Sequence, residues 1–412
     1  MKQLIYIALI IGCLSCKTET IPSPKSHNTA IDTVGYHSDF ELVWSKLAEN
    51  SLICRGTFVY DEGVVFFSQS DKSNARDNIV SLDKITGDTL WVWDEGPYYT
   101  NHRYLVDNTL YFTAGTSVYS LDCITGKTNW EYRPPDLLSY MSLSASNKGI
   151  YVSYQDRGND PLQYESILYE LSPEGFAEEI LRLNASTRNH YTFNFDHVTP
   201  WIHPNGDKIL FCESRSWNYG PKNDGIGEYL AYNQTTRVVY KDWGNLFNTI
   251  DIGGRALIHK GTVYLSSGWS QIAAIKLLDS KILWRHNIVE QVATASLMPL
   301  NMFSNRLYVS LGNQSHLNVF NTTNGKRYKT IDNIGTEWFA TAFKTYNNHL
   351  WFTSTAGLYK LDQDATIVST LNSDELVGTN AGTFTHGMDI DDSTGLIYTT
   401  RGNQFICLRD KH

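Results

Sequence analysis

Two segments of the chain, SLDKITGDTLW (residues 81–91) and SLDCITGKTNW (residues 120–130), are near copies of each other. Within the first copy, Asp83 can accept hydrogen bonds from the backbone N–H groups that follow it, and Gly87 can adopt the positive φ of a tight turn. A catalytic motif is rarely repeated at so short an interval. We therefore interpret the segment as architecture: the end of one strand, a turn, and an outer strand whose Trp91 packs between neighbouring structural units.

A second repeated element indicates how many of these structural units the chain contains. Short stretches such as GVVFFSQS and NTLYFTAG alternate in polarity and are bounded by Gly, Asn and Asp, a pattern typical of β-strands. The spacing of roughly 40 to 60 residues fits four-stranded propeller blades with variable loops. We predict an all-β, eight-bladed β-propeller with four antiparallel strands per blade, or seven blades if the irregular third repeat is not a true blade. The eight stretches begin at Gly63, Asn108, Lys148, Asp207, Gly261, Asn305, Asn348 and Gly395.

The two ends of the repeat region complement each other. ELVWSKLAE (residues 41–49) resembles a fourth strand, with Trp44 in the docking position, but nothing before it supplies the first three strands. The last three strand patterns run to His412 without a fourth. We expect the N-terminal strand to complete the last blade, which closes the ring and removes an exposed sheet edge. Helical patterns occur at GFAEEILRL (residues 175–183) and, for one turn, at TLNSDELVG (residues 370–378).

The N-terminus has the features of an export signal. MKQLIYIALIIGCLSC (residues 1–16) contains one Lys and an apolar run too short to span a bilayer as a mature helix. Its end resembles the lipobox of bacterial lipoproteins, in which a Cys is lipidated. Cys16 is the preferred site because a polar sequence begins directly after it, and Cys13 is the alternative. A plain secretory signal or an uncleaved anchor would also fit.

The lipobox resemblance implies a cellular location for the protein. Residues 17–39 are rich in Ser, Thr, Pro and Lys and are predicted to tether the lipid to a propeller domain of residues 40–412. We expect a bacterial cell-envelope protein, lipid-anchored to the outer membrane and facing the periplasm or the cell surface. The formal net charge is −9 and no basic run occurs, which argues against a nucleic-acid partner.

The turn segments resemble the tryptophan-docking repeat of quinoprotein-type (PQQ-like) β-propellers, A-x-D-x-x-T-G-x-x-x-W. AAIKLLDSKILW (residues 273–284) keeps the same frame, with Lys276 for Asp and Ser280 for Gly. The repeat pattern covers residues 40–412. Length, lipobox and eight blades together resemble the BamB-type lipoproteins of the outer-membrane β-barrel assembly machinery. This resemblance implies a non-catalytic protein-binding scaffold in envelope or outer-membrane assembly.

The quinoprotein dehydrogenases share the repeat but are typically longer, with a Ca²⁺ site and often a vicinal disulfide beside the quinone. In this sequence no two cysteines are adjacent, and no Asp, Asn and Glu constellation suggests that metal. We predict neither a cofactor nor a bound metal, and a quinone-dependent dehydrogenase is the least favoured hypothesis.

Histidines are the candidates for an alternative, enzymatic function. On an extended strand His197 and His203 would point to the same face, where they could act as acid and base in a polysaccharide lyase. His203 also begins the turn sequence HPNGDK and could simply cap it. His102 and His386 are predicted near the mouth of the central channel.

Three long loops, in blades one, three and four, are predicted to crowd one sector of one rim. They contain the aromatic residues Tyr164, Trp217 and Tyr219 among polar residues, which suits a protein interface or a stacked sugar ring. We therefore predict a monomeric, non-catalytic propeller domain that binds an envelope protein. A polysaccharide-binding or polysaccharide-lyase-type propeller is the alternative.

Overall fold

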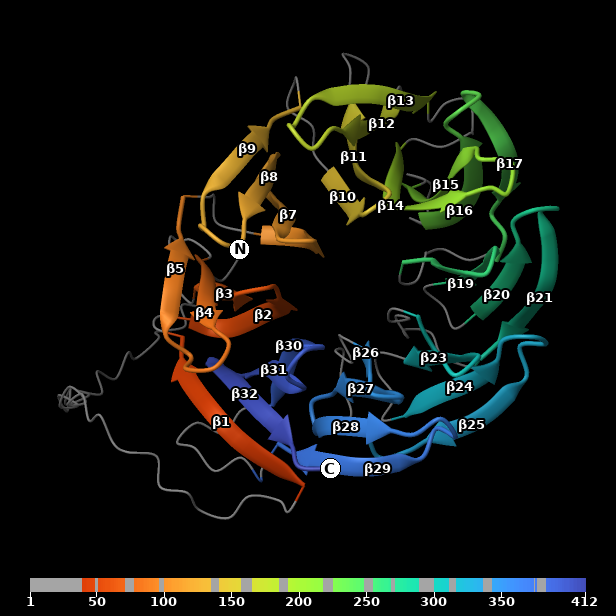
Figure 1. Ribbon diagram of the computed structural model, residues 1–412. Coiled ribbons are helices and arrows are strands. Elements are labelled where there is room, and N and C mark those ends of the chain that lie inside the picture. The colour runs from red at the N-terminus through yellow and green to blue at the C-terminus, as the bar shows by residue number, and fades with distance from the viewer. Residues whose placement is uncertain are drawn as a thin grey trace, which may run out of the picture. The chain divides into compact units, whose positions relative to one another are not determined.

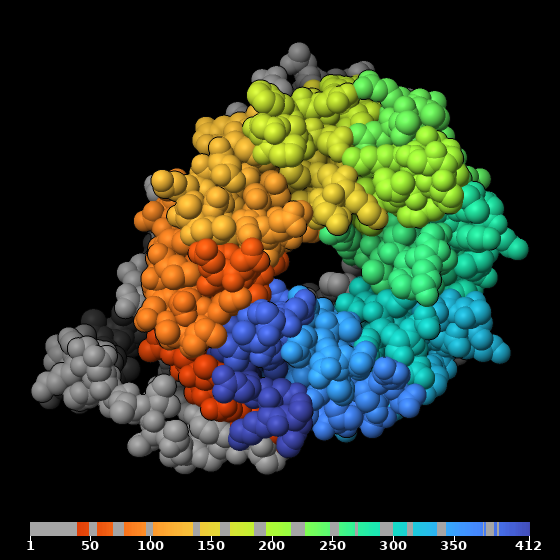
Figure 2. All heavy atoms as spheres, in the orientation of Figure 1, coloured from red at the N-terminus to blue at the C-terminus, as the bar shows by residue number. Residues whose placement is uncertain are grey.

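The chain forms eight four-stranded antiparallel sheets arranged in a ring (Figure 1). This computed structural model describes residues 39–48, 51–70, 78–95, 100–134, 141–156, 165–184, 192–217, 225–247, 255–267, 271–288, 300–310, 316–335, 343–373, 375 and 383–412. Within these ranges there is no helix long and apolar enough to cross a membrane. Figure 2 shows the blades packed around a central opening.

Blades one to four follow one another along the chain, each with its strands in sequence order from the centre outward. Their strands are β2 (Ser51–Val59), β3 (Gly63–Ser70), β4 (Asn78–Asp83), β5 (Thr89–Trp93); β6 (Thr100–Val106), β7 (Thr109–Ala114), β8 (Ser117–Asp122), β9 (Thr128–Tyr132); β10 (Met141–Ser146), β11 (Gly149–Asp156), β12 (Glu165–Leu171), β13 (Ala177–Asn184); and β14 (Thr192–Ile202), β15 (Lys208–Trp217), β16 (Gly225–Asn233), β17 (Val238–Gly244).

Blades five to seven repeat this order, and blade eight takes its outer strand from the N-terminus. Their strands are β18 (Leu257–His259), β19 (Thr262–Ser266), β20 (Gln271–Lys276), β21 (Lys281–Asn287); β22 (Asn301–Phe303), β23 (Arg306–Ser310), β24 (Leu317–Asn321), β25 (Arg327–Ile331); β26 (Phe343–Tyr346), β27 (His349–Thr353), β28 (Gly357–Leu361), β29 (Ile367–Asn372); and β30 (Phe384–Ile390), β31 (Leu396–Arg401), β32 (Gln404–Asp410), β1 (Phe40–Leu47). The prediction of eight blades is confirmed, and the irregular third repeat is a true blade.

The repeated turn has the predicted geometry. Asp83 Oδ1 accepts hydrogen bonds from the backbone N–H groups of Ile85 and Thr86, both at 2.8 Å. The bond from Thr86 N–H is the main cause of the lowered pKa of Asp83. Gly87 follows with φ of 73°, a conformation that costs glycine little.

Each repeated tryptophan docks on the turn of the next blade. Trp44 Nε1 donates to Lys84 O at 3.0 Å, and Trp91 Nε1 donates to Cys123 O at 2.8 Å. The rings lie so close that a Cβ added at Gly87 would be 2.8 Å from the ring of Trp44. Glycine is therefore required at this turn for two reasons: the backbone has a positive φ, and the tryptophan ring of the preceding blade leaves no room for a Cβ. The same pairing joins Trp91 to Gly126, Trp130 to Gly175 and Trp284 to Gly325.

Eight clusters of buried apolar side chains lie between consecutive blades, one at each junction around the ring. The cluster between blades eight and one contains Trp44, Tyr398, Phe405 and Phe66, and the last two rings are stacked with centroids 4.4 Å apart. Burial of this apolar area at every junction is the main stabilising term of the fold.

The N-terminal strand closes the ring as predicted. β1 pairs with β32 in antiparallel register from Phe40 opposite Asp410 to Leu47 opposite Gln404. Its tryptophan then docks on the turn of blade one, where Lys84 Nζ also pairs with Asp391 of blade eight at 3.0 Å. Three chain segments far apart in sequence thus meet at one junction.

The helix predicted at residues 175–183 is wrong. Ala177–Asn184 is the outer strand β13 of blade three. Leu181 pairs with Leu168 and Glu179 with Tyr169, so Ile180 is the extra residue of a bulge. A bulge shifts the period-2 alternation by one residue, which produces a spacing that imitates a helical pattern.

The second helical candidate, at residues 370–378, also begins as strand. Its first residues, through Asn372, belong to β29, and a single turn follows that is closed by Glu375 N–H donating to Asn372 O. Residues 376–378 lie outside the described residues. Among the cysteines, Cys123, Cys212 and Cys407 are buried free thiols.

Replacing Trp44 by alanine tests ring closure. The loss of its packing and of its bond to Lys84 should lower the free energy of unfolding by about 3–5 kcal/mol. Denaturant titration measures this. Leu47→Ala, on the same strand but 52% exposed, is the matched control and should change stability by less than about 0.5 kcal/mol. Equal effects of the two substitutions would contradict the assignment of Trp44 as the closing contact.

Candidate functional site

The predicted rim aromatics fall at or beyond the edge of the described structure. Trp217 is the last residue of β15, opposite Thr192 and Gly225, and its side chain is not among those described. Tyr164 and Tyr219 lie outside the described residues, as do Cys13 and Cys16. The binding and lipidation predictions for these five residues therefore stay predictions.

His197 and His203 both belong to the region of β14 but occupy different surroundings. His203 begins the turn to β15, where its Nδ1 accepts a hydrogen bond from Asn205 N–H at 3.1 Å. The turn-capping role considered for His203 is thus present. Six extended residues span about 20 Å, so the two imidazoles do not share one site. The side chain of His386, on β30, lies outside the described part of the chain.

His197 lies in a cluster of ionisable groups near the central channel. Burial, together with the smaller effects of His102, Arg255 and Arg215, lowers the pKa of His197 to about 3. Burial also lowers the pKa of His102 to about 4, with a contribution from Arg103. Both imidazoles are therefore neutral at neutral pH. Their pKa values are well below those of an efficient general base at pH 7.

Glu213 of β15 is fully buried beside this cluster. Its Oε2 accepts a hydrogen bond from Ala256 N–H, at the start of blade five, at 2.6 Å. Its Oε1 has no partner among the described residues. Burial raises the pKa of Glu213 to about 8, against the opposing effects of the Ala256 N–H and Arg255. The side chain is therefore largely uncharged at neutral pH.

A polar anchor thus fixes the inner strand of blade five against blade four. Glu213 holds the N–H of Ala256, and Thr199 Oγ1 donates to the Ala256 carbonyl at 3.4 Å. Arg255 directly precedes Ala256, so these bonds also hold the backbone of Arg255 in place. Blades two, five and seven carry small residues where blade four has this glutamate, namely Ala114, Ser267 and Ser354.

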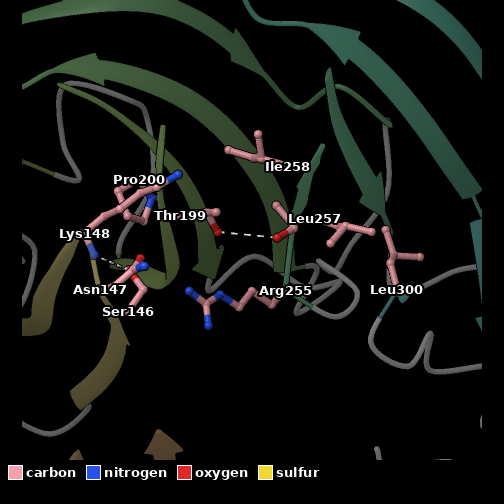
Figure 3. A pocket seen from close by; sticks show the side chains of 10 residues that line it. Ser146, Asn147, Lys148, Thr199, Pro200, Arg255, Leu257, Ile258 and Leu300 are labelled. Atoms are coloured by element: carbon pink, nitrogen blue, oxygen red, sulfur yellow. Dashed lines mark hydrogen bonds between the residues drawn. The ribbon is translucent and has the colours of Figure 1, made fainter. Parts of the chain in front are cut away.

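Arg255 lines a cavity of about 370 Å³ together with residues of blades three, four, five and six. Figure 3 shows its side chain pointing away from β18 toward the side on which Ser146 and Asn147 lie. Its guanidinium carbon lies 5.1 Å from the ring centroid of Tyr104 of β6. Arg255 therefore reaches from blade five to the inner strand of blade two.

A larger groove of about 750 Å³ lies between blades two and three. Phe176, in the turn before β13, lines it and is 76% exposed, the largest exposed fraction among the large apolar side chains of the described chain. Ser146 and Asn147 line both hollows, so the groove and the cavity meet at the turn between β10 and β11.

Among the described residues that line the groove, the charged ones are acidic: Asp107, Glu170 and Glu178. Glu170 is paired with Lys208 at 2.6 Å and Glu178 with Arg237 at 2.5 Å. Asp107, in the turn between β6 and β7, is exposed. The groove therefore combines an exposed aromatic ring with acidic side chains.

Among the described residues no group of three or more His, Cys, Asp or Glu side chains could hold a metal ion. Sequence reasoning missed Arg255, Glu213 and Phe176. For Glu213 a weak signal exists, since a carboxylate stands where three of the other repeats have Ala or Ser, although the remaining four have Gln, Tyr, Leu and Arg. For Arg255 and Phe176 the sequence offers none.

The fold is that of known eight-bladed propellers. BamB from Moraxella catarrhalis superposes with a TM-score of 0.56 and 13% identity, over 90% of this chain and 98% of that one. The quinohemoprotein alcohol dehydrogenase of Comamonas testosteroni gives 0.62 and 10%, over 92% and 78%. The computationally designed protein Ika8 gives 0.59 and 12%, over 90% and 99%.

The predicted likeness to PQQ-like and BamB-type propellers is thus confirmed at the level of the fold. At these identities the likeness shows the fold alone. No protein-family model and no curated protein matches the sequence.

The raised pKa of Glu213 predicts a pH dependence. In the unfolded chain the carboxyl loses its proton near its ordinary pKa of 4.5, and in the folded state only near 8. The stability present below pH 4.5 is therefore lost as the pH rises to 8, with a slope of up to about 1.4 kcal/mol per pH unit. Urea titrations between pH 5 and 8 measure this loss.

Glu213→Gln should flatten the profile, because the amide cannot ionise while its oxygen can still accept from Ala256 N–H. Glu178→Gln is the control, since the Glu178 side chain is 65% exposed. If the wild type and Glu213→Gln lose stability in parallel between pH 5 and 8, Glu213 is not the group responsible.

Proposed function

We propose that this protein is a non-catalytic, lipid-anchored propeller of the bacterial cell envelope that binds a partner protein in the groove between blades two and three. The observation that carries the proposal is Phe176, which is 76% exposed at the edge of a concavity of about 750 Å³. Exposed aromatic side chains beside pockets are frequent anchors of protein interfaces.

The residues that line the groove indicate which side chains a partner segment should carry. Tyr111, Ile150 and Leu171 form the apolar floor, and the charged residues of the lining are acidic. Charge complementarity favours a segment that carries apolar side chains for the floor and a basic side chain for the exposed Asp107.

The cellular setting rests on the sequence and on the fold. The N-terminal export signal with Cys16 supports attachment to an envelope membrane. The shared fold with BamB is consistent with a scaffold role. The low pKa values of His197 and His102 favour binding over acid–base catalysis, which weighs against a polysaccharide lyase at this site.

Site-specific photocrosslinking in intact cells tests the groove. A photoreactive amino acid at position 176 should give one defined protein adduct, because the side chain there faces the partner segment. The same amino acid at position 92 is the matched control. Val92 is 51% exposed on the outer strand β5, away from the groove.

Reversing the groove charge with Asp107→Arg should reduce the adduct at position 176 several-fold through like-charge repulsion with a basic segment. Quantitative immunoblotting measures the reduction. No adduct at position 176, or the same adduct at positions 176 and 92, would refute the proposed binding surface.

A further inference from the structure

Arg255 is a cation with no paired acidic side chain among the described residues. Within the described part of the chain its guanidinium makes no hydrogen bond or ion pair, and its contact is with the ring of Tyr104 at 5.1 Å. The nearby Arg215 differs, since it pairs with Asp196 at 3.2 Å. A guanidinium offers five N–H donors in a planar fork that matches a carboxylate. Arg255 presents this fork to a cavity.

The described lining of the cavity carries positive charge. The ten described residues that line it include Arg255 and Lys148 but no acidic residue, in a protein of formal net charge −9. Hydroxyl and amide groups of Ser146, Thr199 and Asn147 add further polar positions (Figure 3). The electrostatics of the lining therefore favour an anion.

The remaining walls are apolar. They consist of the side chains of Pro200, Ala256, Leu257, Ile258 and Leu300. The volume of about 370 Å³ is at the lower end of the range for small-molecule sites, roughly 300–1,000 Å³. A compact apolar group bearing one charge fits such walls, whereas a highly charged or strongly hydrated anion does not.

Blade four keeps Arg255 in place without neutralising it. The Glu213 and Thr199 bonds to Ala256 fix the backbone next to Arg255. Burial also keeps the Glu213 carboxyl largely protonated near pH 7, because its pKa is raised to about 8. The charge of the guanidinium stays available to a ligand.

We propose that the cavity around Arg255 binds a carboxylate attached to a short apolar group, with the guanidinium fork on the carboxylate and the apolar group against Leu257, Ile258 and Leu300. Two sources supply this chemistry. One is a free small organic acid. The other is the C-terminal carboxylate of a chain lying in the adjoining groove, and this second source rests on the proposed function.

Binding measured by isothermal titration calorimetry, with ligand-detected NMR for weak complexes, tests the site in the folded propeller. The probes are 4-methylpentanoate, its uncharged amide, and a peptide Lys-Ala-Val-Leu with either a free or an amidated C-terminus. The carboxylate form should bind at least about tenfold more tightly than the matching amide, since charge-assisted hydrogen bonds contribute about 1.5–3 kcal/mol.

Arg255→Gln should reduce carboxylate binding to the level of the amide, and Arg255→Lys, which keeps the charge but loses the fork, should bind with intermediate affinity. Arg133→Gln is the control, because the Arg133 side chain is 73% exposed and distant in sequence and blade. If Arg255→Gln proves unstable, the comparison of carboxylate with amide on the wild type still decides the question.

The outcomes separate the two sources. Binding of both 4-methylpentanoate and the free peptide supports the cavity as a site for small acids, and binding of the free peptide alone assigns it to a chain end. The proposal is overturned if neither probe binds at millimolar concentration. It is also overturned if wild type and Arg255→Gln bind the probes equally. Crosslinking at position 176 does not depend on these results, so failure of the carboxylate site and failure of the groove remain distinguishable.

Discussion

The fold depends on a contact that recurs at four of the eight junctions, in which the outer-strand tryptophan of one blade packs on the turn of the next. At the junction of blades eight and one, the ring of Trp44 covers Gly87 and its Nε1–H bonds the Lys84 carbonyl. The contact needs an aromatic ring, a turn without a Cβ and a fixed distance between blades. Because the apolar clusters also form only between blades, no blade is stable alone, and the ring must close to bury its last junction.

Much of this could be predicted because it is local and repeated. The turn chemistry of Asp83 and Gly87, the docking of Trp91 and the pairing of β1 with the last blade all follow from residue types at fixed spacing. The helix expected at residues 175–183 was wrong because a single bulged residue, Ile180, shifts the alternation of the strand. Pattern reasoning has no means to detect such a bulge without the partner strand.

The binding surfaces could not be predicted, because they arise from residues that no sequence spacing relates. Arg255 of blade five reaches Tyr104 of blade two across the centre of the ring. The groove joins the β6–β7 turn to Phe176, which precedes the outer strand of the next blade. The histidines show the opposite error, in which residues close in sequence are expected to share a site. His197 and His203 lie on one strand pattern, but only His197 lies in the buried cluster, and His203 caps a turn.

The repeated turn and its docking tryptophan serve the same structural purpose at each junction where they occur. The repeats themselves therefore carry no information about a ligand, and the informative positions are those where the repeat is broken at a cost in stability. Glu213 is such a position. A buried carboxyl with one oxygen that has no partner among the described residues is unfavourable, and blades two, five and seven have Ala or Ser at this position instead. That cost is reasonable if the Glu213 bond to Ala256 serves to place Arg255. Glu213 and Arg255 then form one functional unit, in which an uncharged acid positions a cation and leaves its charge for the ligand.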